Sequence, residues 1–337
     1  MSALEERVGL RIASMASPVR IAAARTAIVF DAACDLPAEY LNQPNVLVLP
    51  TAVKMGPHEY VDNHDAARTR AFLAELAKSG GADVETRSYS PEEMRALFLE
   101  RLALNYDSIY CLTVSAKRSE IHANASRAAV DTLAAARQLR EAAGITRPFL
   151  LRVIDTKSLF AGQGIAALEL FDMVARGLPA RDITPRLFEV ADSTYGYFVP
   201  DDLHYLRTRA SQRGDRSVGL VATVLGSMLD VKPVVRAHLG TTAPVAKIRG
   251  REEAFRRLFQ FARQRVRSGL MTPHVNLSYG GDLADIRDIP AYMELVQECW
   301  NAEVTLHEST MSMTGCVNVG PRGLALAFAS TAHAPEF

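Results

Sequence analysis

The chain has 337 residues, 48% of them hydrophobic, and its 38 Lys and Arg residues balance its 38 Asp and Glu residues. The length favours two domains, the composition is that of a globular protein with an apolar core, and the neutral charge argues against a nucleic-acid partner. No apolar run has signal-peptide or membrane-spanning length, so we expect a soluble, cytoplasmic protein. The four cysteines (Cys34, Cys111, Cys299 and Cys316) lack metal-ligand spacing, which predicts buried, reduced thiols.

Residues 1–24 are Ala-rich and weakly patterned, which predicts an N-terminal extension. Strands and helices then alternate. The expected strands are Ala27–Phe30, Val46–Lys54, Ser108–Val114 and Phe149–Ile154, and the expected helices are Thr69–Lys78, Pro91–Leu104, Ala123–Ala142 and Leu159–Arg176. Ser90 is the expected N-cap of the second helix, with Pro91 at its first position, and Gly177 ends the fourth. This alternation predicts an α/β domain over residues 25–178, in which helices cover both faces of a mostly parallel sheet.

After Gly177 the pattern changes, and residues 179–337 are expected to form a second, α+β domain. Its expected helices are Pro185–Ala191, Asp202–Ala210, Gly219–Leu229, Arg249–Arg267 and Pro290–Trp300. Its expected strands are Tyr195–Val199, His274–Tyr279, Glu303–His307 and Gly323–Ala329, and a two-stranded hairpin is expected after Leu229. The helix Gly219–Leu229 carries no charge and is apolar nearly all round. Small residues such as Gly226 leave room beside it, either for tight helix packing or for a bound chain.

Hydroxyl-bearing or acidic loops follow elements of the first domain, at Asp31–Asp35, Thr86–Ser90 and Ser115–Ser119. In an open parallel sheet, ligands bind at the carboxyl ends of the strands. Hydroxyls and loop N–H groups there can bind a carboxylate or a phosphate. The alternative is that each of these residues is an ordinary turn or N-cap residue.

Tests for enzyme motifs are negative. The chain has no GxSxG, Walker A or GxGxxG sequence, and its histidines form no helical i, i+4 pair, so no metal site is indicated. Asp31 and Asp155 both end strands, where capping of the next turn is slightly favoured over a metal or base role. A Ser119, His122 and Asp155 triad can be drawn, but no spacing singles it out. A binding protein is therefore favoured, and the alternative is a small hydrolase or phosphoryl-transfer enzyme using Asp31, Ser119 and Asp155.

The chain resembles the DegV family, the bacterial fatty-acid-binding proteins that serve fatty acid kinase. The motifs that carry this resemblance appear in order: IVFDAACDLP from Ile28, EYVD from Glu59, TRSYSP from Thr86, SAKRS from Ser115, VIDTKS from Val153, LGSMLDVKP from Leu225, KIRGR from Lys247 and VGP from Val319. Together they span roughly residues 27–329. No single motif is decisive, but their order is specific.

The resemblance implies a two-domain protein that buries one long-chain fatty acid, or a similar amphiphile, between its domains. The bound fatty acid is then the ligand, no cofactor is expected, and the protein contributes no catalytic group. It presents the carboxylate to a partner kinase subunit, and transient contact with a membrane is compatible with that role. The implied fatty-acid-binding residues are Thr86, Arg87, Ser88, Ser115, Ser119, Asn318, Gly320, Leu225 and Met228.

The chain departs from the family pattern at the expected head-group mouth. Ala32 replaces a serine, Asn318 falls on a histidine position, and Glu120 follows Ser119 where the family has glycine. A glutamate beside a carboxylate ligand would repel it unless it points outward. A third hypothesis is an interaction subunit that docks through the basic helix Arg249–Arg267, for which a solvated basic face is the alternative.

Overall fold

The computed structural model describes residues 25–79, 84–200 and 230–337. Within these residues the strands form three sheets. The first is a four-stranded parallel sheet in the order β2-β1-β6-β7. Its strands are β1 (Thr26–Asp31), β2 (Val46–Leu49), β6 (Ser108–Thr113) and β7 (Leu150–Asp155). This is the parallel sheet that the alternating pattern predicts.

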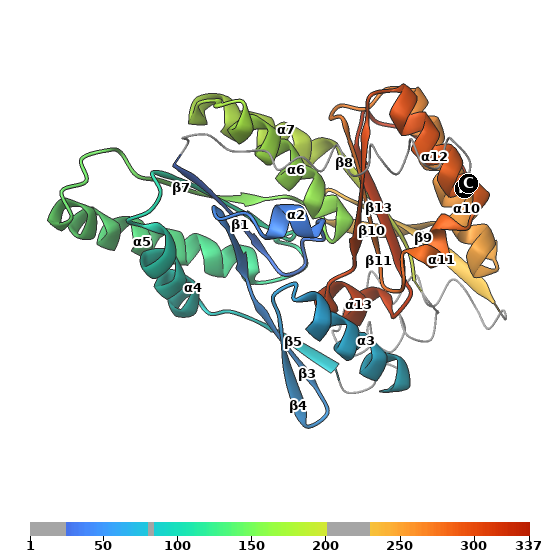
Figure 1. The fold of residues 1–337 in the computed structure, drawn as a ribbon, viewed down its shortest axis with the longest axis horizontal. Coiled ribbons are helices and arrows are strands. Elements are labelled where there is room, and N and C mark those ends of the chain that lie inside the picture. Colours follow the sequence, from blue (N-terminus) through green and yellow to red (C-terminus); the bar gives the residue numbers. More distant parts are fainter. Residues whose placement is uncertain (1–24, 80–83, 201–229) are drawn as a thin grey trace.

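Helices cover both faces of the parallel sheet. Successive residues of a strand point to opposite sides, so each strand contributes side chains to both faces. Val29 and Cys111 pack on one side with α4 (Pro91–Leu97) and α5 (Ile121–Ala142). On the other side, Ile28, Phe30, Tyr110 and Leu112 join a core cluster with α6 (Ala161–Ala175). Figure 1 shows α4 and α5 on the side of the sheet away from α6. Ser90 caps α4 as expected, in a capping box with Glu93, and a π-helical turn at Phe98–Leu102 continues the helix.

A three-stranded antiparallel sheet, in the order β4-β3-β5, corrects two of the predicted elements. Its strands are β3 (Thr51–Met55), β4 (His58–Asp62) and β5 (Val84–Ser88). The single strand expected at Val46–Lys54 is two strands in different sheets, divided at Pro50, whose missing N–H cannot continue a ladder. Thr86–Ser88 was expected in a loop at the end of the parallel sheet, but it forms part of β5 and pairs with β3.

The third sheet has six strands in the order β10-β9-β8-β13-β11-β12, and only β11 and β12 are parallel. Its strands are β8 (Thr194–Val199), β9 (Val231–His238), β10 (Thr241–Arg249), β11 (His274–Tyr279), β12 (Thr305–Thr310) and β13 (Leu324–Ala329). Helices α10 (Arg251–Arg267) and α12 (Pro290–Asn301) cover one face (Figure 1). Helix α6 packs on the other face, and it therefore contacts strands of both large sheets.

The close approach of α6 to this sheet depends on two glycines. A Cβ on Gly164 would lie 2.2 Å from Asn276 Nδ2 and 2.7 Å from the backbone oxygen of Asp35. A Cβ on Gly162 would lie 2.1 Å from Ser158 Oγ. A larger side chain at Gly164 would push α6 away from β11, and one at Gly162 would clash with the loop that leads into α6.

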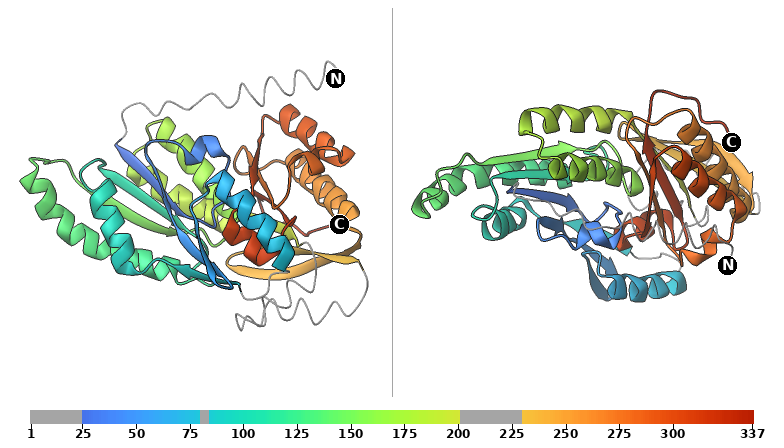
Figure 2. Two further views of the ribbon diagram at one scale, coloured as in Figure 1. Left: turned by 60° about the horizontal axis from the view of Figure 1, so that its bottom comes forward. Right: turned by 45° about the horizontal axis from the view of Figure 1, so that its top comes forward.

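The remaining helices are α2 (Ala38–Leu41), α3 (Ala66–Ser79), α7 (Ala180–Ser193), α11 (Ala284–Arg287) and α13 (Met313–Val319). Helix α13, which no sequence pattern predicts, packs beside α3 and β3 (Figure 2). The expected helices Asp202–Ala210 and Gly219–Leu229 lie outside the described residues. No helix in the described part of the chain is long and apolar enough to cross a membrane. The division of the chain at residue 178 stays a prediction.

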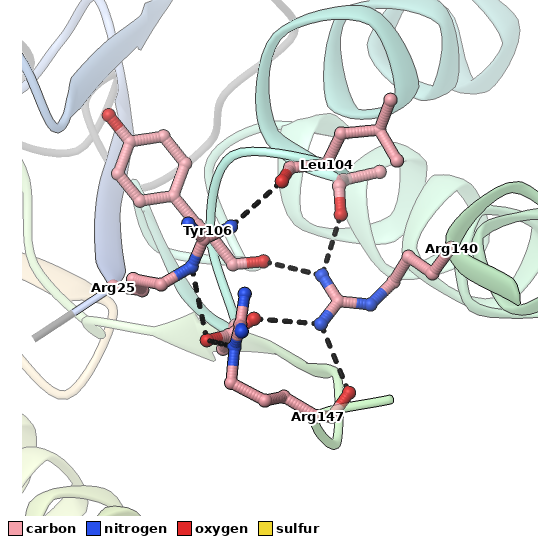
Figure 3. Close-up of polar contacts among 7 residues, drawn as sticks. Arg25, Leu104, Tyr106, Arg140 and Arg147 are labelled. Carbon is pink, nitrogen blue, oxygen red and sulfur yellow. Dashed lines mark hydrogen bonds and ion pairs between the residues drawn. The ribbon is translucent and has the colours of Figure 1, made fainter. Parts of the chain in front are cut away.

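A network of ion pairs and hydrogen bonds lies at the edge of the parallel sheet opposite the strands' carboxyl ends (Figure 3). The buried guanidinium of Arg140 donates to the backbone oxygens of Ala103, Tyr106 and Arg147 and to Asp107 Oδ1, at 2.7–3.0 Å. Arg25 and Arg147 pair with the other Asp107 oxygen. The end of α5 is thereby fixed to the starts of β6 and β7.

Candidate functional site

Asp31, at the carboxyl end of β1, is fully buried and its two oxygens are used within the protein. Oδ1 accepts a hydrogen bond from the Ala33 N–H (3.0 Å), and Oδ2 accepts from the Val114 N–H (2.7 Å) and Gln163 Nε2 (3.1 Å). Burial raises the pKa of the Asp31 carboxyl, and these hydrogen bonds oppose that rise. The carboxylate therefore holds the turn after β1 against β6 and α6, as the capping interpretation predicts.

Asp35, four residues later, joins the first segment of the chain to its last quarter. Its Oδ2 accepts from Ser278 Oγ (2.6 Å) and its Oδ1 from the Ser312 N–H (2.9 Å). Asn276 Nδ2 donates to the Asp35 backbone oxygen and to that of Ala161, both at 2.9 Å. Burial raises the pKa of Asp35 as well. In the sequence, Asp35 stands out only as part of a motif, because none of these partners is nearby in the chain.

The three-stranded sheet carries a row of polar residues on one face. Thr51 pairs with Asp62 on one side and with Ser88 on the other, so the three side chains share a face. Thr86 occupies the same face two residues along, beside the buried Val53. The alternation of β5 thus directs two of the predicted head-group residues, Thr86 and Ser88, to the side of the apolar cluster.

Arg87 points to the opposite face of β5. Its guanidinium pairs with Glu93 at 3.0 Å and lies over the ring of Tyr89. This ion pair raises the pKa of Arg87 above its usual value. The side chain is largely exposed, and it lies away from Thr86 and Ser88.

Four buried polar atoms next to this row have no hydrogen-bond partner among the described residues. They are Thr51 Oγ1, Asp62 Oδ1, His64 Nε2 and Thr314 Oγ1. They belong together, because Asp62 Oδ2 accepts from the Thr314 N–H at 2.7 Å and Thr51 is the ladder partner of Asp62. His64 follows Asp62 by two residues, and its charge acts on Asp31 and Asp35. We call these four residues the polar cluster. Buried polar groups without partners mark places where water, an ion or a ligand binds.

The Ser115–Ser119 loop lies at the carboxyl end of β6, next to Asp31. Ser115 is fully buried, and its Oγ accepts from the Lys117 N–H at 3.3 Å. The tip of the β9–β10 hairpin rests on this loop, because Lys117 Nζ donates to the Leu239 oxygen and Arg118 donates to Thr242 Oγ1. A Cβ on Gly240 would lie 2.6 Å from Ser115 Oγ. The loop is therefore held between the two large sheets.

Ser119 Oγ accepts from the Ile121 N–H at 3.3 Å, at the start of α5. The neighbouring Glu120 is exposed. His122 Nδ1 lies 3.0 Å from Thr113 Oγ1, and Asp155 Oδ1 accepts from the N–H groups of Ala116 and Lys157. The hydrogen bonds of the described structure thus do not join Ser119, His122 and Asp155 into a triad.

Asn318 and Gly320 lie at the end of α13. Asn318 Nδ2 donates to the Thr314 backbone oxygen at 2.6 Å, within its own helix. Gly320 follows the helix with a φ of 97°, a left-handed conformation that glycine adopts without strain. The remaining two predicted residues, Leu225 and Met228, lie outside the described residues.

The polar residues border an apolar cluster shared by all three sheets. It joins Phe30 of β1, Val53 of β3 and Phe198 of β8 with α3, α6 and α13. Among the described residues, no group of three or more His, Cys, Asp or Glu side chains is arranged to hold a metal ion. The arrangement suits a ligand with an apolar body and one polar end.

Comparison with known proteins assigns the family. The model of the DegV family of uncharacterised proteins matches residues 25–331. A DegV domain-containing protein of Xanthomonas campestris is 48% identical over 309 residues, which cover 92% of this chain and 98% of that protein. The chain belongs to the DegV family, and the resemblance seen in the sequence is confirmed.

Solved structures confirm the predicted fold class. A stearic-acid-binding protein of Eubacterium ventriosum matches with a TM-score of 0.72 at 22% identity, covering 90% of this chain and 97% of that one. The fatty acid kinase B3 protein of Streptococcus pneumoniae, solved with linoleic acid, matches with a TM-score of 0.68 at 16% identity, covering 90% and 99%. At these identities the likeness establishes the α/β fold that positions the site.

Proposed function

We propose that this protein is a cytoplasmic carrier that buries the chain of a long-chain fatty acid and holds its carboxyl group at the polar cluster. The observation that carries the proposal is the placement of unpartnered buried polar atoms at the border of an apolar cluster shared by three sheets. Family membership and the fatty-acid-binding proteins of the same fold support it. The predicted residues Thr86 and Ser88 share a face of the three-stranded sheet with Thr51 and Asp62 of the polar cluster.

The energy of such binding comes from the chain. Each buried methylene contributes about 0.8 kcal/mol, so a chain of fatty-acid length is held by its apolar area even with few polar contacts. The head group then needs hydroxyls and N–H groups to replace water, because a buried carboxylate without hydrogen bonds is costly. In this proposal the protein contributes binding and orientation and no catalytic group.

Native mass spectrometry of the purified full-length protein tests the binding. We expect a complex with one acyl chain per protein, either co-purified or formed on addition of oleate or palmitate. A mass of the free protein that does not change with either fatty acid contradicts the proposal. Oleoyl-coenzyme A, whose head group is far larger, serves as a control for nonspecific uptake by the apolar surface.

We further propose that the bound carboxyl group is presented to a partner kinase, as the structural likeness to a fatty acid kinase B3 protein suggests. Incubation of the oleate-loaded protein with ATP and a bacterial fatty acid kinase subunit is expected to yield acyl phosphate. A loaded protein that yields none contradicts this part alone. The basic helix is a weak docking candidate, since Arg256 and Arg257 pair with Glu253, and Arg263 and Arg267 pair with Glu298.

A further inference from the structure

His64 differs from the titratable Asp31, Asp35 and Asp62 near the site because its unused buried atom is a ring nitrogen that can donate a hydrogen bond. Nε2 has no hydrogen-bond partner within the described part of the chain. The residue lies between β4 and α3 with a φ of 62°, a left-handed conformation that costs a non-glycine residue free energy. Two short-range contacts fix this turn: the Asp65 N–H donates to Asn63 Oδ1, and the Arg68 N–H donates to Asp65 Oδ1.

The surroundings of His64 are acidic. Asp31, Asp35 and Asp62 are each fully buried. Burial raises the pKa of Asp31 and Asp35, and the charge of His64 lowers the pKa of both. An ionised carboxyl group in this region repels an anionic head group, so the head group needs a hydrogen-bond donor directed at it.

Hydrogen-bonding capacity identifies which groups are available to a ligand. Asp31 and Asp35 have no free hydrogen-bonding group for a ligand, because their oxygens already accept from N–H and O–H donors. Asp62 Oδ1 is an acceptor, and Thr51 Oγ1 belongs to its ladder partner, so one water between them is able to serve both. The unused donors that remain are the Thr314 hydroxyl and the ring nitrogen of His64.

We propose that His64 binds the carboxylate head of the fatty acid through Nε2, with the Thr314 hydroxyl as a second donor. The inference rests on the proposed function, because it assigns a residue to the same site. It adds a contact that the motif residues do not supply. It also gives the polar cluster a ligand chemistry: an anionic head accepts hydrogen bonds from His64 and Thr314 and faces away from Asp62.

The test compares a charged head group with a neutral one on the delipidated full-length protein. Oleate and methyl oleate share one chain, and only oleate carries a carboxylate. We expect His64→Ala to weaken oleate binding about 10-fold or more, the usual effect of losing a hydrogen bond to a charged group. Its affinity for methyl oleate is expected to stay within about 2-fold of the wild type, because chain burial is untouched. His64→Gln keeps an N–H donor and is expected to recover part of the loss.

His58→Ala is the matched control, since His58 is exposed at the start of β4, the strand that precedes His64. The inference is overturned if His64→Ala binds oleate as the wild type does, or if it loses oleate and methyl oleate equally. In either case the proposed function stands, because the wild type still binds. A wild type that takes up no fatty acid overturns both.

Imidazole ¹⁵N spectra of the wild type provide a test that needs no stable variant. Addition of oleate is expected to shift the His64 Nε2 signal and to leave that of His58 in place. A His64 signal that does not move at saturating oleate overturns the inference even if His64→Ala fails to fold.

Discussion

The two faces of the six-stranded sheet are built from the same strands and differ in the size and polarity of their residues. The outer face, under α10 and α12, carries Tyr195, Tyr197, Leu326 and Phe328. The inner face carries more small residues (Gly196, Ala237, Ala325 and Ala327) and the polar Asn276 and Ser278, with Phe198 as its one Phe, Tyr or Trp residue among the described strands. The outer face is a close-packed core of its own. The inner face gains its packing from α6 and from the first segments of the chain, and it borders the site.

The largest effect expected from this difference is on the outer face. Phe328 is fully buried, and its ring lies 5.9 Å from that of Tyr197 and 6.2 Å from that of Phe261, between centroids. Phe328→Ala removes the ring and leaves a cavity, so we expect a loss of about 3–5 kcal/mol in the free energy of unfolding. Urea denaturation measures it. Fatty-acid binding by the protein that remains folded is expected to be unchanged, and weaker binding would show that the two faces are coupled.

A smaller loss of stability, but a loss of function, is expected from the inner face. Ala327 faces α6 at Gly162, where an added Cβ would lie 3.7 Å away. Ala327→Leu overfills this contact, with an expected cost of about 1–3 kcal/mol. Oleate titration measures the accompanying loss of affinity. Leu326→Ile, next to it but on the outer face, is the control, and equal effects of both on oleate binding would contradict the distinction.

The smallest effect concerns the pH dependence of stability. Burial raises the folded-state pKa of Asp35, so the folded protein holds this proton more tightly than the unfolded chain does. The contribution of Asp35 is therefore most favourable below its unfolded pKa, and it declines as the pH rises through the folded value. Asp35→Asn removes this titration. We expect its stability in urea titrations, relative to the wild type, to improve as the pH rises from the unfolded pKa of Asp35 through the raised folded value, and a constant difference would contradict the shift.

Prediction from the sequence succeeded where one strand or helix carries its own pattern. Strands β1, β6, β11 and β13 and helix α10 have apolar runs or periodicity that identify them within a few residues. Helix α13 (MTGCVNV) was missed because it is short and rich in residues of low helix propensity. Strands β4 and β5 were missed because they are polar on one side and lie in a sheet that is not continuous with the first.

The candidate site shows the same limit. Thr86, Ser88 and Ser115 come from the motif resemblance and stay predicted site residues, and the β3–β5 pairing places Thr86 and Ser88 on the face that carries Val53. The polar cluster was not found, because it joins Asp62 and His64 to Thr314, about 250 residues further along the chain. A sequence shows which residues can donate or accept a hydrogen bond, but only the fold shows which of those groups are left without partners.

The contacts of Asp35 determine how late during synthesis of the chain the site is able to form. Its hydrogen bonds reach Ser278 and Ser312, which lie 243 and 277 residues away. Such long-range contacts form slowly, because the intervening chain must close a large loop. A nascent chain released through residue 250 has the parallel sheet but none of these partners. The site therefore closes only after nearly the whole polypeptide has left the ribosome, and a truncated chain that lacks β11 and α13 is expected to retain no fatty acid.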